Sequence, residues 1–333
     1  MSSYAIISDK MLQIGDQLDH YQILAHLAQG GMSDIYKAYD LVNRRDVAIK
    51  VPDQSMMGDP AQYERFQREM EVISSLDHPA IQKGLGSGKY NRIPYMVTQY
   101  VDGRSLRTVI DESAPMPPEQ ALPLVRKIAE GMAYCHANHV IHRDLKPENI
   151  LVTASGQPVI KDFGLALTKS SHRVTYSNLS ATMGTPDYMA PEQIEGERGG
   201  LPTDVYALGT ILFELLAGRT PFSGDTNLAV MQQHLQKSAP RLDRIRPGVP
   251  PAIAALVARC LARNPDERFP DMQALIDAID HPETIDLEIL EKADRGPDRF
   301  PFWQTQAFRG VLIALGILAA FVILALLLQA LHR

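Results

Sequence analysis

The stretch that decides the fold reads HRDLKPEN at residues 142–149, and DFG follows it at residues 162–164. Transfer of a phosphoryl group needs cations around the phosphates, oxygen ligands for magnesium and a carboxylate that orients the attacking hydroxyl. The first stretch contains a carboxylate in Asp144, a cation in Lys146 and a carboxamide ligand in Asn149. DFG alone means little, because such a tripeptide recurs by chance in turns. The two stretches in this order indicate chemistry on a nucleotide phosphate.

Upstream residues complete this set. Residues 47–50 read VAIK, an apolar strand that ends in Lys50, and a lysine placed there can reach the α- and β-phosphates. Glu69 on the next helical stretch is a candidate partner for Lys50, although such a pair is more often a surface ion pair of little consequence. Asp162 offers a second magnesium ligand. We therefore expect ATP and Mg2+ as cofactors.

The apolar pattern predicts an α+β chain with strands first and helices afterwards. Short apolar runs separated by turn residues predict strands between residues 21 and 101, and the spacing within residues 61–76 predicts one helix among them. From residue 102 onward the pattern is mostly helical. The predicted helices are residues 122–138, 204–217 and 253–263. The apolar pair Val140-Ile141 predicts a strand that leads into the HRDLKPEN loop.

Composition excludes several classes of protein. The 333 residues are 45% hydrophobic and 22% charged, which is typical of a globular chain. A net charge of −6 gives no support for binding nucleic acid. The two cysteines, Cys135 and Cys260, form neither a disulfide framework nor a metal site and suit a reducing compartment. The first 17 residues lack the layout of a signal peptide.

The C-terminal end predicts a membrane anchor. Residues 310–331 carry no charge, and 22 residues of helix span roughly 33 Å, which is enough to cross the hydrocarbon core of a bilayer. A buried core helix is the alternative, but apolar residues on every face of so long a segment disfavour it. Trp303 precedes the span, as expected of an aromatic residue at the headgroup level, and Arg309 lies at the boundary. Arg295 and Arg299 add positive charge on the same side, so the rest of the chain should be cytoplasmic. Gly316 and Ala320 form a small-xxx-small pair, a candidate homodimer face.

Taken together, the motifs resemble the eukaryotic-type, or Hanks-type, serine/threonine protein kinase family. The resemblance covers residues 21–279, and GTPDYMAPE at residues 184–192 looks like the bacterial members. It implies a two-lobed protein kinase fold, with a β-rich N-lobe at 21–101 and an α-helical C-lobe at 102–281, and one C-terminal transmembrane helix. The expected flanking segments are an N-terminal extension at 1–20, a juxtamembrane linker at 282–308 and the span at 309–331. The resemblance thus implies protein substrates and a single-pass protein whose kinase domain faces the cytoplasm, at a bacterial inner membrane.

The resemblance also assigns roles to single residues. Asp144 and Lys146 would be catalytic, and Asn149 and Asp162 would hold Mg2+. Thr98 would be the gatekeeper. The other residues that would contact ATP are Lys50, Glu69, Leu27, Ala28, Gly30, Ser33, Ile35, Ala48, Gln99, Tyr100 and Val101. Glu192, Asp204 and Arg268 would be structural, with Asp204 bracing the catalytic loop and Arg268 pairing with Glu192. Lys146 together with Thr185 is the pattern of serine/threonine rather than tyrosine specificity.

One departure from the family affects the phosphate loop. Residues 28–33 read AQGGMS, so only the middle glycine of Gly-x-Gly-x-x-Gly is present, at Gly30. A Cβ at Ala28 and Ser33 stiffens the backbone, which predicts either an altered nucleotide affinity or impaired ATP binding. We favour the first, because every other catalytic position is filled.

Two alternatives to an active protein kinase remain, a membrane-tethered pseudokinase scaffold and an enzyme that phosphorylates a small molecule. Ser180 and Thr182, between DFG and APE, are candidate sites of autophosphorylation.

Overall fold

The computed structural model describes residues 12–29, 33–52, 60–90, 93–164 and 186–295 of the chain. The chain divides into two units, Met1–Asp294 and Arg295–Arg333, and every described residue except Arg295 belongs to the first of them. The predicted span at 309–331, Gly30 and the two candidate phosphorylation sites Ser180 and Thr182 lie outside the described residues. Within the described ranges, no helix is long and apolar enough to cross a membrane.

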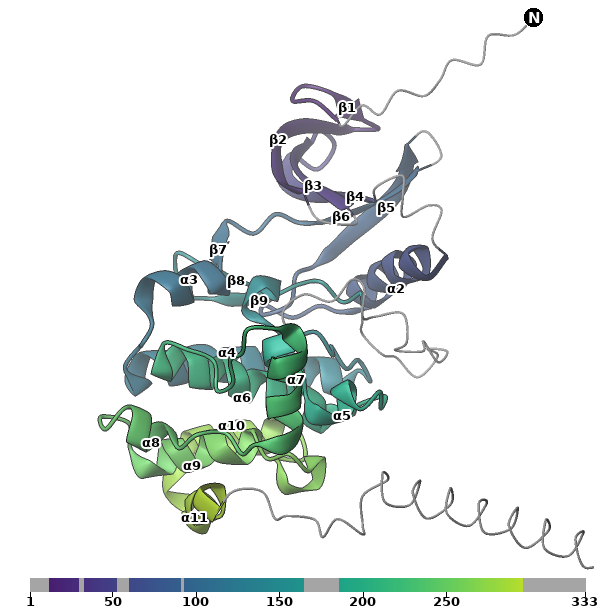
Figure 1. The fold of residues 1–333 in the computed structure, drawn as a ribbon. Helices are drawn as coiled ribbons and strands as arrows, with labels where there is room; N and C mark the ends of the chain where they lie inside the picture. Colours follow the sequence, from purple (N-terminus) through teal and green to yellow (C-terminus); the bar gives the residue numbers. More distant parts are fainter. Residues whose placement is uncertain (1–11, 30–32, 53–59, 91–92, 165–185, 296–333) are drawn as a thin grey trace, which may run out of the picture. The chain divides into compact units, whose positions relative to one another are not determined.

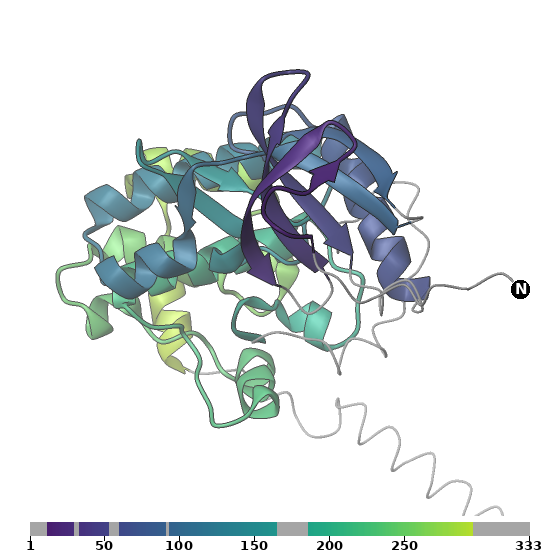
Figure 2. The ribbon, with the colours of Figure 1, turned by 90° about the horizontal axis from the view of Figure 1, so that it is seen from above.

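The N-terminal lobe is a curled, six-stranded antiparallel sheet (Figures 1 and 2). Alternate side chains of its strands face a core that includes Ile23, Tyr36, Val47 and Ile49, as a strand period of two requires. Leu18 is fully buried in this core, so the folded sheet begins before residue 21. In sheet order the strands are β1 (Gln17–Leu18), β2 (Tyr21–Gln29), β3 (Ser33–Asp40), β4 (Arg45–Pro52), β6 (Ile93–Gln99) and β5 (Gly84–Tyr90).

The helix expected among the strands is α2 (Pro60–Ser75). Its buried face carries Phe66 and Ile73, which form a small cluster with Met96 of β6. These positions repeat at the helical period, which is why the sequence predicted them to share one face. The same face carries Glu69, which is buried although it is charged.

The C-terminal lobe is mostly helical, and the small antiparallel sheet of β7 (Gly103–Ser105), β8 (Ile150–Thr153) and β9 (Pro158–Ile160) lies between its helices and the curled sheet (Figure 1). The helices are α3 (Leu106–Ser113), α4 (Pro118–Ala137), α5 (Pro191–Ile194), α6 (Leu201–Ala217), α7 (Asn227–Gln236), α8 (Leu242–Ile245), α9 (Pro251–Cys260), α10 (Met272–Asp280) and α11 (Glu288–Arg295). Short 3-10 turns within the described part of the lobe join them: η1 (Pro147–Asn149), η3 (Pro186–Tyr188), η4 (Pro265–Glu267) and η5 (Pro282–Thr284).

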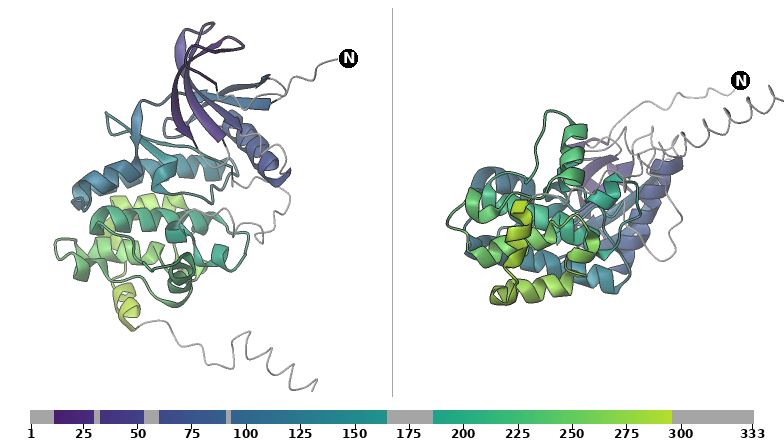
Figure 3. Two further views of the ribbon diagram at one scale, coloured as in Figure 1. Left: turned by 45° about the horizontal axis from the view of Figure 1, so that its top comes forward. Right: turned by 60° about the horizontal axis from the view of Figure 1, so that its bottom comes forward.

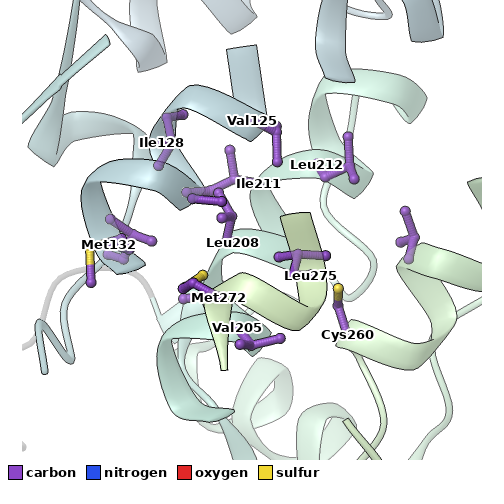
Figure 4. Close-up of a cluster of buried hydrophobic side chains, with 14 of the residues drawn as sticks. Val125, Ile128, Met132, Val205, Leu208, Ile211, Leu212, Cys260, Met272 and Leu275 are labelled. Atoms are coloured by element: carbon purple, nitrogen blue, oxygen red, sulfur yellow. The ribbon is translucent and has the colours of Figure 1, made fainter. Parts of the chain in front are cut away.

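Helix α6 is the centre of this lobe, because α4, α9 and α10 all pack against it (Figure 4). Every residue from Thr203 to Leu216 is buried, which explains why its sequence is apolar on all faces. Gly209 lets α6 and α9 pack closely together, because a Cβ at this position would lie 2.3 Å from the Cβ of Cys260 on α9. A substitution at Gly209 would therefore push α6 and α9 apart.

Three segments differ from the sequence prediction. Val140-Ile141 is no strand: Val140 donates its backbone N–H to Cys135 at the end of α4, and Ile141 makes only an isolated β-bridge. The helix predicted at 253–263 ends at Cys260, where the next residues turn. The first part of the predicted linker, residues 282–295, forms η5 and α11 instead. Helix α11 lies at the end of the lobe far from the curled sheet (Figures 1 and 3), and its Leu290 is buried in the core.

Candidate active site

The strand register of the curled sheet gathers the residues expected to contact ATP. Residues directly opposite one another in antiparallel strands project from the same face. Ile35 of β3 is opposite both Ala28 of β2 and Lys50 of β4, and Ala48 is opposite Thr98 of β6. Because Ala48 and Lys50 are two residues apart on one strand, all five side chains share a face.

The remaining expected contacts lie at the ends of these strands. Leu27 is next to a register shift in β2, and its side chain is 44% exposed. Ser33 begins β3 and is buried. Gln99 ends β6 and donates its backbone N–H to Lys83, while Tyr100 and Val101 follow the strand. The strand register thus puts Ala28, Ile35, Ala48, Lys50 and Thr98 on one face of the sheet. The roles of Leu27, Ser33, Gln99, Tyr100 and Val101 in binding ATP stay predictions.

Lys50 is held by two carboxylates from different parts of the chain. Its Nζ donates to Glu69 Oε1 at 2.9 Å, to Glu69 Oε2 at 2.7 Å and to Asp162 Oδ1 at 3.0 Å. Burial opposes the charged amine, but Asp162 and Glu69 outweigh it and raise the pKa of Lys50 above its usual range. Lys50 is therefore a fixed cation, and the pairing with Glu69 that the sequence suggested is present.

Asp204 of α6 organises the backbone of the catalytic loop. Its Oδ2 accepts from the His142 backbone N–H at 2.9 Å, and its Oδ1 accepts from that of Arg143 at 2.8 Å. His136 Nε2 lies 2.8 Å from the same Oδ2. Arg143 has a φ of 67°, a left-handed conformation that non-glycine residues adopt only when their surroundings enforce it. The bonds from Asp204 supply that enforcement, in agreement with its expected bracing role.

Asp144 and its neighbours form a compact polar cluster. Lys146 Nζ lies 3.1 and 3.0 Å from the two carboxylate oxygens of Asp144. Asn149 Nδ2 donates to the backbone oxygen of Asp144 at 2.8 Å and to its Oδ2 at 3.0 Å. The Asp144 side chain is 34% exposed, so a substrate hydroxyl can reach it. Because the amide nitrogen of Asn149 faces Asp144, its amide oxygen is the atom that remains to coordinate a cation.

Asp162 lies between two lysines. Its Oδ1 accepts from Lys50, and its Oδ2 lies 2.5 Å from Nζ of Lys161, the preceding residue. Burial alone would raise the pKa of Asp162, but Lys50 and Lys161 hold it well below its usual range. Sequence reasoning missed Lys161, although its position directly before DFG was a visible signal. Phe163 of the same motif is fully buried, and its ring centroid lies 4.8 Å from that of His142.

Asn149 and Asp162 fit a divalent cation that is shared with a nucleotide. Both offer oxygen, the ligand type that Mg2+ prefers, and Mg2+ is usually held by one or two carboxylates together with substrate phosphates and water. Among the described residues, no three His, Cys, Asp or Glu side chains are grouped so that they could hold a metal by themselves. This donor set suits an ion that arrives with its nucleotide.

Glu192 and Arg268 form the buried ion pair that the sequence suggested. Arg268 Nη1 and Nη2 donate to Glu192 Oε1 and Oε2 at 2.8 and 2.7 Å, and the side chain of Arg268 is 0% exposed. Arg268 also donates to the carbonyl oxygens of Ala262, Pro202 and Arg263. The pair therefore ties the APE motif, at the start of α5, to the start of α6 and to the turn that follows α9.

Comparison with known proteins identifies the family of this chain. The family model described as "Protein kinase domain" matches residues 21–279. Serine/threonine-protein kinase PrkC of Bacillus subtilis is 37% identical over 257 residues, which are 76% of this chain and 39% of PrkC. Serine/threonine-protein kinase PknB of Mycolicibacterium smegmatis is 36% identical over 255 residues, 75% of this chain and 41% of PknB. The chain thus spans about two fifths of the length of these relatives.

A solved structure shares the fold. The crystal structure of the Mycobacterium tuberculosis PknI kinase domain superposes with a TM-score of 0.64 at 25% sequence identity. The match covers 82% of this chain and all of that domain. The expected two-lobed architecture, with a curled N-terminal sheet and a helical C-terminal lobe, is therefore confirmed.

Proposed function

This chain belongs to the protein kinase family, and from that premise we propose that it transfers the γ-phosphoryl group of ATP to serine or threonine hydroxyls of proteins. The observation that carries the proposal is the assembled site. Lys50 is paired with both Glu69 and Asp162, while Asp144 lies within hydrogen-bond distance of Lys146 and Asn149. A scaffold that had lost catalysis would have no need to keep these contacts.

Each side chain has a task that its position allows. Lys50 holds the α- and β-phosphates, and Glu69 keeps its amine in place. Asn149 and Asp162 hold the divalent cation, for which we propose Mg2+, and the bound ion neutralises charge on the phosphates. Asp144 orients the substrate hydroxyl and accepts its proton. Lys146, beside Asp144, stabilises the negative charge of the transferring group.

One assay tests this proposal against its alternatives. The full chain in detergent is incubated with Mg2+ and γ-labelled ATP, with and without a basic acceptor protein, beside the Lys50→Met variant. We expect label on protein with the native chain and little with the variant. Absent labelling in both would favour the scaffold. Label on a supplied small-molecule alcohol but on no protein would favour the small-molecule enzyme.

We also propose that the chain is activated by phosphate on Ser180 or Thr182. The support is a cluster of cations around Arg143: burial, together with nearby Arg198 and Arg68, lowers the pKa of Arg143 to about 10 in spite of Asp204. Arg198 and Arg68 act on Arg143 as like charges, and a phosphate bound near them would offset that repulsion.

We predict that residues 165–185 carry phosphate in the purified native chain. Mass spectrometry should find phosphate in this segment of the native chain and none in Asp162→Asn, because the variant lacks a metal ligand needed for transfer. Alanine at both Ser180 and Thr182 should lower kcat by about tenfold or more, whereas alanine at Ser155, an exposed turn residue, should leave it unchanged. An unphosphorylated segment in an active native chain would refute the idea.

Residues 309–331 are proposed as a single membrane-spanning helix that holds the kinase unit at the cytoplasmic face, at a bacterial inner membrane. The support is the uncharged, apolar run of residues 310–331, which follows Arg309. On fractionation of cells, the full chain should sediment with membranes and a chain ending at residue 308 should stay in the supernatant. A full chain in the supernatant would contradict the anchor.

The candidate homodimer face at Gly316 and Ala320 is tested by crosslinking the native chain and Gly316→Leu. An unchanged fraction of dimer in the variant would contradict this face.

A further inference from the structure

Each carboxylate oxygen of Asp162 is already paired with the amine of a lysine. Lys50 Nζ lies 3.0 Å from Oδ1, and Lys161 Nζ lies 2.5 Å from Oδ2. The Asp162 side chain is 29% exposed and that of Lys161 is 21% exposed, so the second pair is partly shielded from water. Lys50 belongs to the proposed phosphate site, whereas the proposed function leaves Lys161 without a task.

Adjacent residues seldom pair in this way. In an extended strand, neighbouring side chains point to opposite faces, so Lys161 and Asp162 would face apart. The left-handed conformation of Asp162, with a φ of 65°, turns its carboxylate back toward Lys161. The left-handed region is uncommon for non-glycine residues, although aspartate adopts it more readily than most.

The backbone of Lys161 is fixed on both sides by the catalytic loop. Its N–H donates to the Asn149 carbonyl at 2.9 Å, and its carbonyl oxygen lies 3.1 Å from His142 Nε2. The lysine side chain therefore starts from a fixed point beside the two proposed metal ligands, Asn149 and Asp162. Such an anchored amine keeps a high local concentration at the Asp162 carboxylate.

We propose that Lys161 is a built-in competitor for the divalent cation, so that metal binding at Asp162 must displace the Lys161 amine from Oδ2. The inference rests on the proposed metal role of Asp162. A divalent cation and an ammonium group within about 4 Å repel strongly, so both do not occupy one carboxylate oxygen. The lysine therefore raises the concentration of divalent cation that the kinase needs.

Manganese binding measures this competition directly, because bound Mn2+ loses the electron paramagnetic resonance signal of the free ion. The full chain is titrated with Mn2+ in detergent, with and without a non-hydrolysable ATP analogue. Lys161→Met should tighten Mn2+ binding by about three- to fivefold, the upper part of the range expected when a partly exposed ion pair is removed. Lys161→Arg keeps the cation and should stay within about twofold of the native chain. Lys83→Met, which removes a lysine paired with exposed Asp77 at 3.0 Å, is the matched control and should change nothing.

The outcomes separate the lysine from the metal site. Unchanged Mn2+ binding in Lys161→Met overturns the proposal, because the lysine then does not compete with the cation. Weaker Mn2+ binding also overturns it, because Lys161 then helps to bind the cation and its nucleotide. Lys161→Gln, of similar length and neutral, gives the same test if thermal unfolding shows that the methionine variant is misfolded. Mn2+ binding that survives Asp162→Asn overturns the metal role itself, and the competition with it. Binding lost in Asp162→Asn and tightened in Lys161→Met supports both.

Discussion

Replacing Asp144 by Asn is expected to lower kcat for phosphoryl transfer by about 10²- to 10⁴-fold, the usual contribution of a positioned general base. The amide has the same shape as the carboxylate and can still meet Lys146 and Asn149, which contact Asp144 at 3.0 to 3.1 Å and 2.8 to 3.0 Å. What it loses is the negative charge that orients the substrate hydroxyl and accepts its proton. Since Asp144 has no proposed contact with the nucleotide, the dissociation constant for an ATP analogue should stay within about twofold.

Rapid-quench kinetics at saturating ATP give the rate, and calorimetry gives the nucleotide affinity. Asp77→Asn serves as the control, because Asp77 is also paired with a lysine but its side chain is 76% exposed on the surface. A kcat for Asp144→Asn equal to that of the control would show that Asp144 does not take part in the reaction. A parallel loss of nucleotide affinity would show that the substitution disturbs the site as a whole.

Replacing Arg268 by Met is expected to lower the free energy of unfolding by about 3–5 kcal/mol, the cost of leaving one partner of a buried ion pair alone. Glu192 would keep its charge in a buried position, where the Thr203 hydroxyl, 2.7 Å away, is the side-chain hydrogen-bond donor that remains among the described residues. The carbonyl oxygens of Ala262 and Pro202 would lose their donor as well. Denaturant unfolding of the native chain and the variant, followed by fluorescence, measures the difference.

The matched control is Arg126, whose side chain is 37% exposed and pairs with Asp280 at 2.7 Å. Arg126→Met should cost no more than about 1 kcal/mol, because water screens an exposed pair. A double variant, Glu192→Leu with Arg268→Met, should recover part of the lost stability by removing the stranded charge. Equal losses in the free energy of unfolding for Arg268→Met and Arg126→Met would mean that burial of the Arg268–Glu192 pair does not increase its contribution to stability.

The sequence was enough for the order of lobes, because its signals were periodic. Alternating apolar residues predicted the strands that carry Ala48 and Lys50, and the all-round apolar pattern after Asp204 predicted the buried α6. Motif spacing predicted the catalytic cluster for the same reason: Asp144, Lys146 and Asn149 are close in sequence, so their proximity in space is nearly guaranteed. The contact between Arg268 and Glu192, 76 positions apart, came only through resemblance to the family.

What the sequence did not reveal depends on tertiary structure. Helix α11 has a sequence dominated by charge, and its docking through Leu290 shows only when the lobe provides a surface for it. Val140 and Ile141 look like a strand, but the backbone of Val140 is already used by Cys135. The pair of Lys161 with Asp162 needs a left-handed φ at Asp162, which no residue pattern specifies.

The measurement that tests the central claim most directly is identification of the phosphorylated amino acid after the chain has acted on ATP. The native chain and Asp144→Asn are each incubated with Mg2+ and γ-labelled ATP, the protein is hydrolysed in acid, and the phosphoamino acids are separated. An active serine/threonine kinase gives labelled phosphoserine or phosphothreonine with the native chain and almost none with Asp144→Asn. Phosphotyrosine as the main product, or the same label in both proteins, would contradict the proposed function.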